Sequence, residues 1–461
     1  MIILSKSKLP EVIDLFSGCG GLALGFQMAG FCVTHGIELM ENAVKNANYN
    51  LSIKRKEKGL HICGDITQLS ESIFKNQIGP NGCIVIGGPP CQAYSLIGRA
   101  KLNSLMDEGS FLDDKRGFLF EDFLRFAIGL EAKAVVMENV KSCTAYGKLN
   151  VPEKVAEILE RCGYTVYWTI LNSADYGVPQ IRERMILYAV KGDNVEPVLP
   201  KPTHSGKWFG GLYSGIGLTD LCNSGECRHF IMPRMRRKIQ PRWLTVEEAI
   251  GDLPELHARA GSQYSPHSMN LQMDYVSEPQ NDYQRMMREN TGMGVTANVY
   301  RNTKRDFSIF ALMNEGDNFI QAVEIAERLF QEACRRQGVK AGTEAYDRLR
   351  KEIVPPYSTE KFLSKWKKLE GDKPSHTLVA HLSVDTYSHI HPWEPRGISV
   401  REAARLQSFP DDYIFQGSMG DAFKQIGNSV PPLMAKGIAI ALKEALRKQA
   451  KNNGFSDKDT E

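Results

Sequence analysis

Long hydrophobic runs are missing from this sequence of 461 residues. A membrane-spanning helix needs about 20 predominantly apolar residues in a row, and no stretch reaches that length. The apolar start, Met1–Leu4, is shorter than the core of a secretory signal peptide. The sequence therefore predicts no membrane segment, and we expect the protein to be cytoplasmic.

An excess of one charge sign and a regular cysteine pattern are also missing. The formal net charge is +3, so any nucleic-acid surface must be local. The 10 cysteines are unevenly spaced, which excludes a disulfide framework and predicts reduced thiols. There is no internal repeat or low-complexity block, and the hydrophobic content of 42% is ordinary for globular proteins. We therefore expect two or three domains with real cores.

A glycine cluster near the N-terminus follows the first predicted strand. Residues 12–15 indicate a strand, Ser17–Gly21 a tight turn, and residues 22–30 a helix that ends at glycine. Strand, glycine loop and helix form the first unit of a nucleotide-binding α/β fold, because glycines admit a ligand close to the backbone. The dinucleotide fingerprint G-x-G-x-x-G is incomplete here.

Two acids follow the glycine loop at the ends of the next predicted strands. Glu38 ends the second strand, where a carboxylate can accept hydrogen bonds from ribose hydroxyls, and Asp65 follows the third, where it could receive an adenine amino group. The alternative is that both acids cap the helices that follow them.

A cysteine stands at the end of another apolar strand. GGPPCQAYS, Gly87–Ser95, follows the short run Ile84–Ile86. Pro89 and Pro90 have fixed φ angles and orient the end of the strand. Cys91 comes directly after them, so the pattern favours an exposed thiol on a rigid element over a buried structural cysteine.

With this loop, the sequence resembles the DNA (cytosine-5)-methyltransferases of the bacterial modification type. Similar blocks occur in the order of that family: DLFSGCGG at Asp14–Gly21, GPPCQ at Gly88–Gln92, MENV at Met137–Val140, QIRERM at Gln180–Met185, REAARLQSFPDDY at Arg401–Tyr413, and QIGNSVPP at Gln425–Pro432. The fold that the resemblance implies is α/β, a doubly wound Rossmann-like sheet of the S-adenosylmethionine-dependent type with a smaller target recognition domain.

The resemblance also implies a division of the chain. We expect a catalytic and cofactor-binding domain over residues 1–195 and a linker with the target recognition domain over 196–395. The last family blocks occupy 396–450, where the C-terminal helix completes the catalytic domain beside the first helix. Residues 451–461 are expected to form a disordered tail.

The family chemistry assigns roles to four side chains. Cys91 is the nucleophile that attacks carbon 6 of cytosine, which makes carbon 5 reactive. Glu138 shares a proton with ring nitrogen 3. Arg182 and Arg184 alternate along a predicted strand and face one side, where a guanidinium binds the cytosine oxygen and orients Glu138. By resemblance this duty falls mainly on Arg182.

The implied cofactor is S-adenosyl-L-methionine, the methyl donor, with S-adenosyl-L-homocysteine as its product. The residues carried over to its pocket are Phe16, Gly18, Gly20, Glu38, Asp65, Ile66, Pro90, Asn428 and Ser429.

The implied partner is double-stranded DNA, from which the target base must be rotated out. The segment after Cys91 is a candidate lid, in which Gln92, Ser95, Gly98 and Arg99 are candidate DNA contacts. By family analogy we expect a monomer that works beside a cognate restriction endonuclease or other defence-system proteins. The recognised DNA sequence is not readable from the chain.

The middle of the chain carries weaker signals. Thr245–Leu256 indicates a short helix, and Asp317–Gly338 a longer helix that serves as scaffold. Two basic stretches, Arg228–Arg242 and Lys361–Lys368, suit phosphate contact or form ordinary solvated faces.

The grouping of Cys222, Cys227 and His229 lacks a fourth ligand at zinc spacing, so we predict no metal. Two rival functions stay open. One is an RNA cytosine-5 methyltransferase on the same scaffold, and the other is a catalytically silent DNA-binding regulator, against which the presence of both Cys91 and Glu138 argues.

Overall fold

The computed structural model describes residues 9–56, 59–90, 119–145, 150–206, 227–233, 241–256, 268–303, 305–356 and 365–452. Contacts divide the chain into two units. The first combines Met1–Trp243 with Ser429–Glu461, and the second is Leu244–Asn428.

The first unit is built on one sheet, in which the described strands run in the order β3-β2-β1-β4-β5-β7-β6. The strands are β1 (Glu11–Leu15), β2 (Val33–Glu38), β3 (Leu60–Cys63), β4 (Cys83–Gly87), β5 (Ala134–Val140), β6 (Tyr164–Asn172) and β7 (Glu183–Lys191). Their neighbours are parallel except at β7, which is antiparallel to both β5 and β6. The mostly parallel sheet confirms the predicted α/β class.

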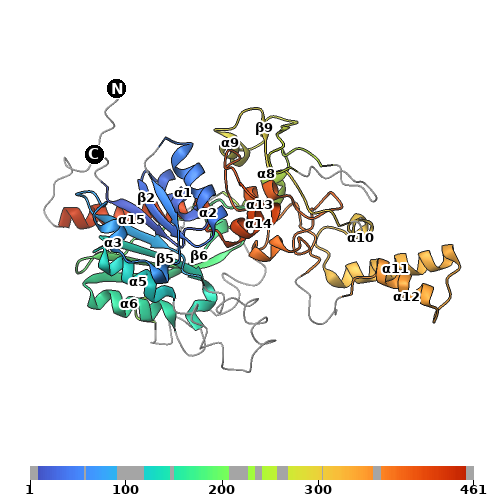
Figure 1. Ribbon diagram of the computed structural model, residues 1–461, viewed down its shortest axis with the longest axis horizontal. Coiled ribbons are helices and arrows are strands. Elements are labelled where there is room, and N and C mark those ends of the chain that lie inside the picture. The colour runs from blue at the N-terminus through green and yellow to red at the C-terminus, as the bar shows by residue number, and fades with distance from the viewer. Residues whose placement is uncertain are drawn as a thin grey trace. The chain divides into compact units, whose positions relative to one another are not determined.

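Helices lie on both faces of this sheet (Figure 1). They are α1 (Gly21–Met28), α2 (Glu41–Ala47), α3 (Ser72–Lys75), α5 (Leu119–Gly129), α6 (Val151–Arg161) and α15 (Pro432–Asn452), with the π-helix η1 (Asn48–Ile53) and the 3₁₀ turns η2 (Ile66–Gln68), η5 (Lys141–Ala145) and η6 (Ser173–Tyr176). Two-sided cover explains why the central strands are continuously apolar rather than alternating.

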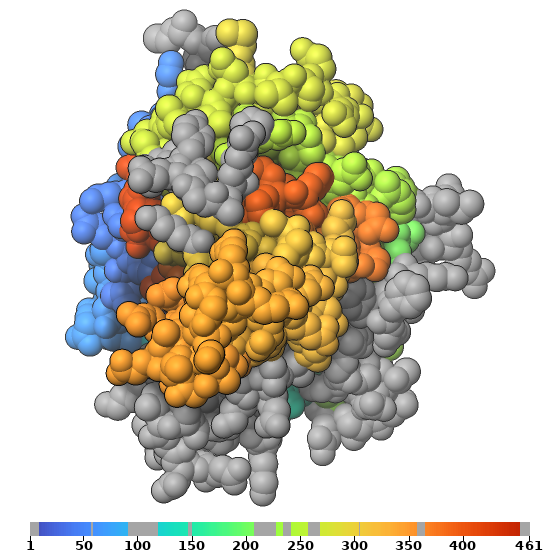
Figure 2. All heavy atoms as spheres, turned by 90° about the vertical axis from the view of Figure 1, so that its right-hand side faces the viewer, coloured from blue at the N-terminus to red at the C-terminus, as the bar shows by residue number. Residues whose placement is uncertain are grey.

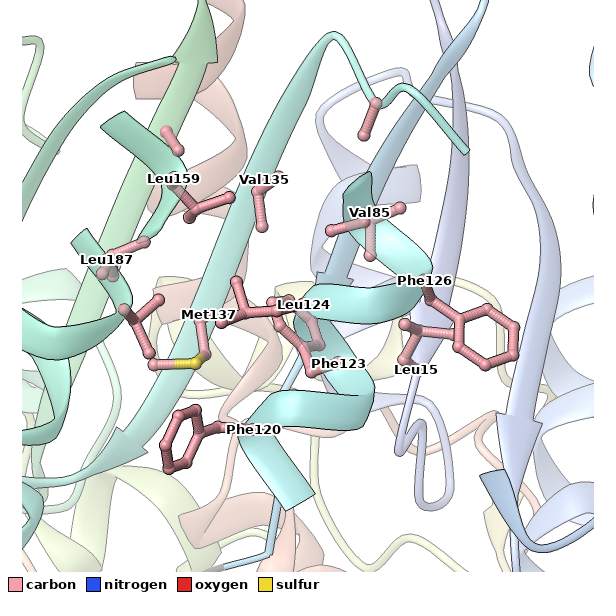
Figure 3. Packing of buried hydrophobic residues seen from close by; sticks show 14 of the residues in the cluster. Leu15, Val85, Phe120, Phe123, Leu124, Phe126, Val135, Met137, Leu159 and Leu187 are labelled. Carbon is pink, nitrogen blue, oxygen red and sulfur yellow. The ribbon is translucent and has the colours of Figure 1, made fainter. Parts of the chain in front are cut away.

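One face of the sheet packs against α5 and α6 to form the main core (Figure 3). Phe123 and Phe126 of α5 are fully buried over Val85 and Met137, which face the same side of neighbouring strands. At about 25 cal/mol per Å² of apolar surface, burial of this kind is the dominant stabilising term.

On the other face, the C-terminal helix α15 packs against α1. A Cβ built on Gly25 would lie 2.3 Å from Ala435 Cβ, so only glycine permits this close approach of the two helices. The pairing places the end of the chain in the same unit as its beginning. The helix continues through Asn452, so the first two residues of the tail expected over 451–461 are helical.

The described part of the second unit contains hydrophobic clusters around Trp366 and around Tyr300. Its elements are α8 (Val246–Ile250), β8 (Met273–Asp274), α9 (Asp282–Arg288), β9 (Gly294–Val295), α10 (Phe307–Leu312), α11 (Phe319–Gln337), α12 (Glu344–Ile353), η7 (Ala380–Ser383), α13 (Val400–Leu406) and α14 (Met419–Asn428). The helices expected near Thr245 and over Asp317–Gly338 are confirmed, and a capping box opens each of them. Helices α11 and α12 form a broad outer surface of this unit (Figure 2).

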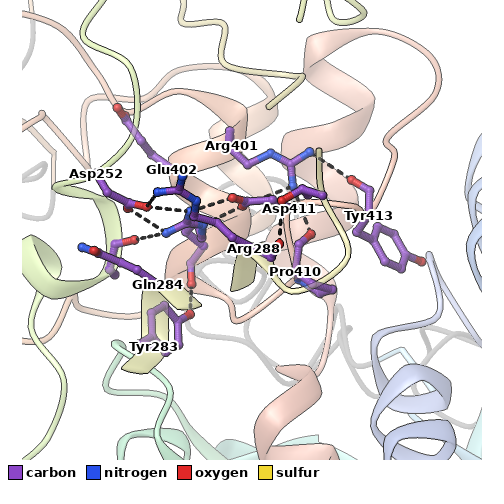
Figure 4. A network of polar contacts seen from close by, with 12 residues as sticks. Asp252, Tyr283, Gln284, Arg288, Arg401, Glu402, Pro410, Asp411 and Tyr413 are labelled. Atoms are coloured by element: carbon purple, nitrogen blue, oxygen red, sulfur yellow. Dashed lines mark hydrogen bonds and ion pairs between the residues drawn. The ribbon is translucent and has the colours of Figure 1, made fainter. Parts of the chain in front are cut away.

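Buried arginines hold the second unit together (Figure 4). Arg405 is fully buried and bonds Asp411 with Nε, at 2.6 Å, and Asp252 with Nη1, at 3.0 Å. Arg401 donates to the carbonyls of Pro410 and Tyr413. Arg401 and Arg405 are therefore structural within this unit, because their guanidinium groups bond to partners inside it.

Two described residues of the Lys361–Lys368 stretch contradict both expectations for it, phosphate contact and a solvated face. Trp366 is fully buried and stacks on Tyr387, with ring centroids 4.8 Å apart. Lys368 is also buried, and its ammonium donates to the carbonyls of Phe310 and Met313. In the sequence, lysines alternating with aromatic residues resemble a basic surface. In the structure, Trp366 packs in the core, and backbone carbonyls accept hydrogen bonds from the buried Lys368 ammonium.

Candidate active site

The carboxyl ends of four neighbouring strands meet at one edge of the sheet. Leu15 of β1 pairs with Ile37 of β2 and with Gly87 of β4, and Glu38 pairs with Cys63 of β3. The residues that follow these strand ends therefore lie side by side. In parallel α/β sheets this edge is where ligands bind.

Gly88, Pro89 and Pro90 lead from β4 to Cys91, which lies outside the described residues. The described part of this loop is tied to β5. Asn139 Nδ2 donates to the carbonyl of Pro89 at 3.4 Å. A Cβ built on Gly88 would lie 2.9 Å from Glu138 Oε2, so the missing side chain leaves room for that carboxylate.

Glu138 is therefore positioned against the loop that carries the cysteine. Its side chain is 12% exposed, and burial raises its pKa while Arg184 and, more weakly, Arg182 oppose that rise. A raised pKa favours the protonated carboxyl group, which suits it to share a proton with a ring nitrogen.

The two arginines occupy different environments. Arg184 Nε lies 3.0 Å from Glu138 Oε1 and forms the salt bridge. Arg182 is 2% exposed and comes just before β7, where its backbone N–H donates to Asn172 Oδ1. Burial and Arg184 lower the pKa of Arg182, and Glu138 raises it, so both guanidiniums act on this carboxylate electrostatically. Arg184 thus contacts the carboxylate directly, and Arg182, which the resemblance favours for this role, adds positive charge beside it.

The glycine loop after β1 adopts an unusual backbone. Phe16 has a φ of 59°, in the left-handed region that a bulky residue seldom enters, and Gly18 and Gly20 have φ of 54° and 87°. A Cβ on Gly20 would lie 2.6 Å from Leu51 Cδ1. Strain of this kind persists where the surroundings enforce it, and it is found at ligand sites.

Glu38 closes the loop from the second strand. Its Oε2 accepts the N–H of Gly18 at 2.9 Å, and its Oε1 accepts the N–H of Met40 at 2.8 Å. A carboxylate has about four acceptor sites, so Glu38 retains capacity for further hydroxyl donors. Leu39, directly after this acid, is a further candidate for the site that the motifs do not mark. Its apolar side chain is 67% exposed. A hydrophobic residue at that position of a strand end is the signal that could have found it.

Asp65 has the capping role that the sequence left as an alternative. It is exposed, and its Oδ1 accepts both the N–H and the hydroxyl of Thr67 at the start of η2. The next residue, Ile66, is buried. Capping uses Oδ1, and a carboxylate has about four acceptor sites, so Asp65 can accept from a further donor.

Other predicted cofactor residues are placed in part. The side chains of Cys19 and Ser429 form a hydrogen bond, so Ser429 lies against the glycine loop, and burial raises the pKa of Cys19 to about 12. Pro90 is exposed at the end of its loop. Asn428 is exposed and is the last residue of the second unit. The predicted DNA contacts Gln92, Ser95, Gly98 and Arg99 lie outside the described residues.

His229 is engaged in a different cluster. Its Nδ1 lies 2.7 Å from Glu153 Oε2 and its Nε2 lies 2.9 Å from Glu160 Oε1, while Cys222 lies outside the described residues. In the part of the chain that the structure describes, no group of three or more His, Cys, Asp or Glu side chains could hold a metal ion. Among the same residues, no helix is long and apolar enough to cross a membrane.

Comparison with known proteins decides the family. The sequence model of the C-5 cytosine-specific DNA methylases matches residues 11–444. The chain belongs to this family. It is accordingly a DNA (cytosine-5)-methyltransferase, and the resemblance drawn from the motif blocks is confirmed.

Similar proteins cover the chain almost completely. M.OihORF3336P of Oceanobacillus iheyensis is 50% identical, over 96% of this chain and 97% of that protein. The type II methyltransferase M.AgeI of Thalassovita gelatinovora is 31% identical, over 95% and 100%. A crystal structure described as a prophage-encoded DNA modification methyltransferase (E. coli) shares the fold, with a TM-score of 0.62 and 22% identity over 95% of this chain and 99% of that one.

Proposed function

We propose that this methyltransferase transfers a methyl group from S-adenosyl-L-methionine to carbon 5 of a cytosine in a specific duplex DNA sequence, through a covalent bond to Cys91. The observation that carries the proposal is the position of Glu138. This buried carboxyl group lies against Gly88, on the short loop that leads to Cys91, and is bonded to Arg184. Nucleophile, proton donor and cation would then converge on one ring.

The residues at the strand ends fit the proposed cofactor. The left-handed loop from Phe16 to Gly20 leads into the N-terminus of α1, whose first N–H groups have no intrahelical partner. Glu38 would hold the ribose hydroxyls, Asp65 and Ile66 the adenine, and Leu39 would cover its face. Pro90, Asn428 and Ser429 complete the set that we propose. When bound, S-adenosyl-L-methionine supplies a methyl group on a positively charged sulfur.

The side chains of the protein would prepare the cytosine. The Cys91 thiolate attacks carbon 6, a carbon–sulfur bond forms, and the ring electrons move toward nitrogen 3. Glu138 donates a proton to that nitrogen, so that carbon 5 becomes nucleophilic without a full negative charge on the ring. Arg184 orients the carboxyl group, and Arg182 adds positive charge beside it. After methylation the carbon 5 proton passes to water, the carbon–sulfur bond breaks to release the Cys91 thiolate, and the nitrogen 3 proton returns to Glu138.

The target carbon is inaccessible inside a duplex, so the base must rotate out, at a cost of about a few kcal/mol. The type II methyltransferases among the relatives support a modification role beside a cognate endonuclease. We propose that the protein acts as a monomer in this setting.

The test is methyl transfer from tritiated S-adenosyl-L-methionine to mixed genomic DNA, with Cys91→Ser as the matched control. We expect label in DNA with the wild type alone, recovered as 5-methylcytosine, and sequencing of the product would give the recognised site. Parallel reactions contain tRNA. Label in tRNA instead of DNA would overturn the DNA substrate, and no label in either would favour a silent regulator. Equal labelling by Cys91→Ser would overturn the covalent step.

A further inference from the structure

A buried histidine reaches the glycine loop from two strands away. His61, in β3, is 2% exposed, and its Nδ1 lies 2.9 Å from Ser17 Oγ, which is itself 7% exposed. Ser17 lies between the two left-handed residues Phe16 and Gly18. No catalytic step uses His61, so its position requires another explanation.

The intervening strand makes room for the ring. In the sheet, β2 separates β1 from β3, and Gly36 of β2 pairs with both Asp14 and His61. A Cβ built on Gly36 would lie 2.1 Å from His61 Nδ1, which is far inside contact distance. The imidazole therefore passes across the glycine backbone, and any side chain at position 36 would block the path to Ser17.

The side chain of Asn48 holds the backbone of His61 through two hydrogen bonds. Its N–H donates to Asn48 Oδ1 at 2.7 Å, and its carbonyl accepts from Asn48 Nδ2 at 2.9 Å. Burial lowers the pKa of His61 to about 4, so the ring is neutral at neutral pH. A neutral imidazole exposes one ring nitrogen as an acceptor, which matches a hydroxyl donor on Ser17.

Hydrogen bonds from β2 also hold the loop. Ser17 N–H donates to the carbonyl of Ile37 at 3.0 Å, and Gly18 N–H donates to Glu38 at 2.9 Å. Both of these bonds hold the backbone from β2. The bond from His61 holds the side chain of Ser17 and comes from β3. It therefore restrains Ser17 from a different strand than the two backbone bonds from β2.

We propose that His61 is a positioning residue for the methyl-donor loop, holding Ser17 across Gly36 so that Phe16–Gly20 keeps its binding conformation. The proposal rests on the proposed function of this loop as the S-adenosyl-L-methionine site. Loss of the bond frees the loop, and part of the binding free energy is then spent on ordering it.

The test measures the dissociation constant of S-adenosyl-L-homocysteine by calorimetry for the wild type, Ser17→Ala, His61→Ala and the double variant. A hydrogen bond of ordinary strength predicts about 2- to 10-fold weaker binding for each single change. The double variant should bind the ligand as well as the single variant with the lower affinity, because both changes remove the same hydrogen bond. His61→Asn, whose amide oxygen can replace Nδ1 as acceptor, should recover part of the loss.

The matched control is His35→Ala. His35 is a histidine on β2 whose ring bonds Thr34 and Gln77, so this change should leave the dissociation constant unaltered. In turnover assays, His61→Ala should raise KM for S-adenosyl-L-methionine and leave kcat nearly unchanged.

Three outcomes separate the hypotheses. No cofactor binding by the wild type would overturn the proposed function itself. Wild-type binding with unchanged affinity in Ser17→Ala would overturn the positioning role even if His61→Ala fails to fold. Additive losses in the double variant would show that the two side chains act independently, which also contradicts the proposal.

Discussion

Arg184 Nε lies 3.0 Å from Glu138 Oε1, and both side chains are 12% exposed. The pair joins β7 to β5, which run antiparallel, so a residue at the start of β7 reaches the end of β5 that lies against Gly88. The cation opposes the effect of burial on the pKa of Glu138. The ion pair thereby holds the carboxyl group in one orientation.

Glu138→Gln removes the proton donor and keeps the shape. We expect kcat to fall by about 10²- to 10⁴-fold, the usual contribution of general acid–base catalysis. The affinity for S-adenosyl-L-homocysteine should not change. Single-turnover kinetics with tritiated donor, together with calorimetry, would measure both, and near-normal turnover would remove Glu138 from the chemistry.

Arg184→Gln should shift the pH dependence of turnover. Arg184 lowers the pKa of Glu138 and burial raises it, so loss of the cation leaves the carboxyl group protonated to higher pH. The limb of the pH profile that reports Glu138 should move upward in pH, and kcat should fall because the orientation is lost. Arg184→Lys, which retains the charge, serves as the control and should move that limb less.

Asp65→Ala should weaken binding of the methyl donor. Asp65 caps η2 through Thr67, so the variant loses both an adenine contact and part of the local order. We expect about a 10-fold rise in the dissociation constant, as for loss of one hydrogen bond to a charged group. Thr67→Val, the control, removes the hydroxyl bond to Asp65 and keeps the backbone N–H bond. Equal affinity in Asp65→Ala and the wild type would count against the pocket as drawn.

His389→Gln should reduce the acid sensitivity of the protein. His389 is buried against His376, and burial lowers its pKa to about 4. The unfolded chain binds a proton near pH 6.5, while the folded site stays neutral to about pH 4. Stability is therefore lost as pH falls between these values, on the order of 3 kcal/mol for this group.

The measurement is the melting temperature of the wild type and of His389→Gln between pH 7 and pH 4. The wild type should lose more stability over this range than the variant. Parallel curves for the two proteins would mean that His389 does not contribute to the acid response.

Local sequence determined much of this protein. The strand ends, the glycine loop, the Pro-Pro turn before Cys91 and the helix caps are encoded by neighbouring residues, and each motif therefore predicts its own conformation. The family blocks likewise mark Glu138 and the two arginines. Only the tertiary structure shows that Arg184 bonds Glu138, because this contact depends on the register between β5 and β7.

The same limit applies to burial and to contacts between strands. In the sequence, Trp366 and Lys368 resemble part of a DNA-binding surface. In the structure, the Lys368 ammonium instead donates to the carbonyls of Phe310 and Met313, which are distant in sequence. Ser17 and His61 are far apart in sequence and become partners because Gly36 lies between them in the sheet. A residue's neighbours along the chain shape its backbone, whereas its partners in space, and therefore its charge state and role, depend on how the sheet assembles.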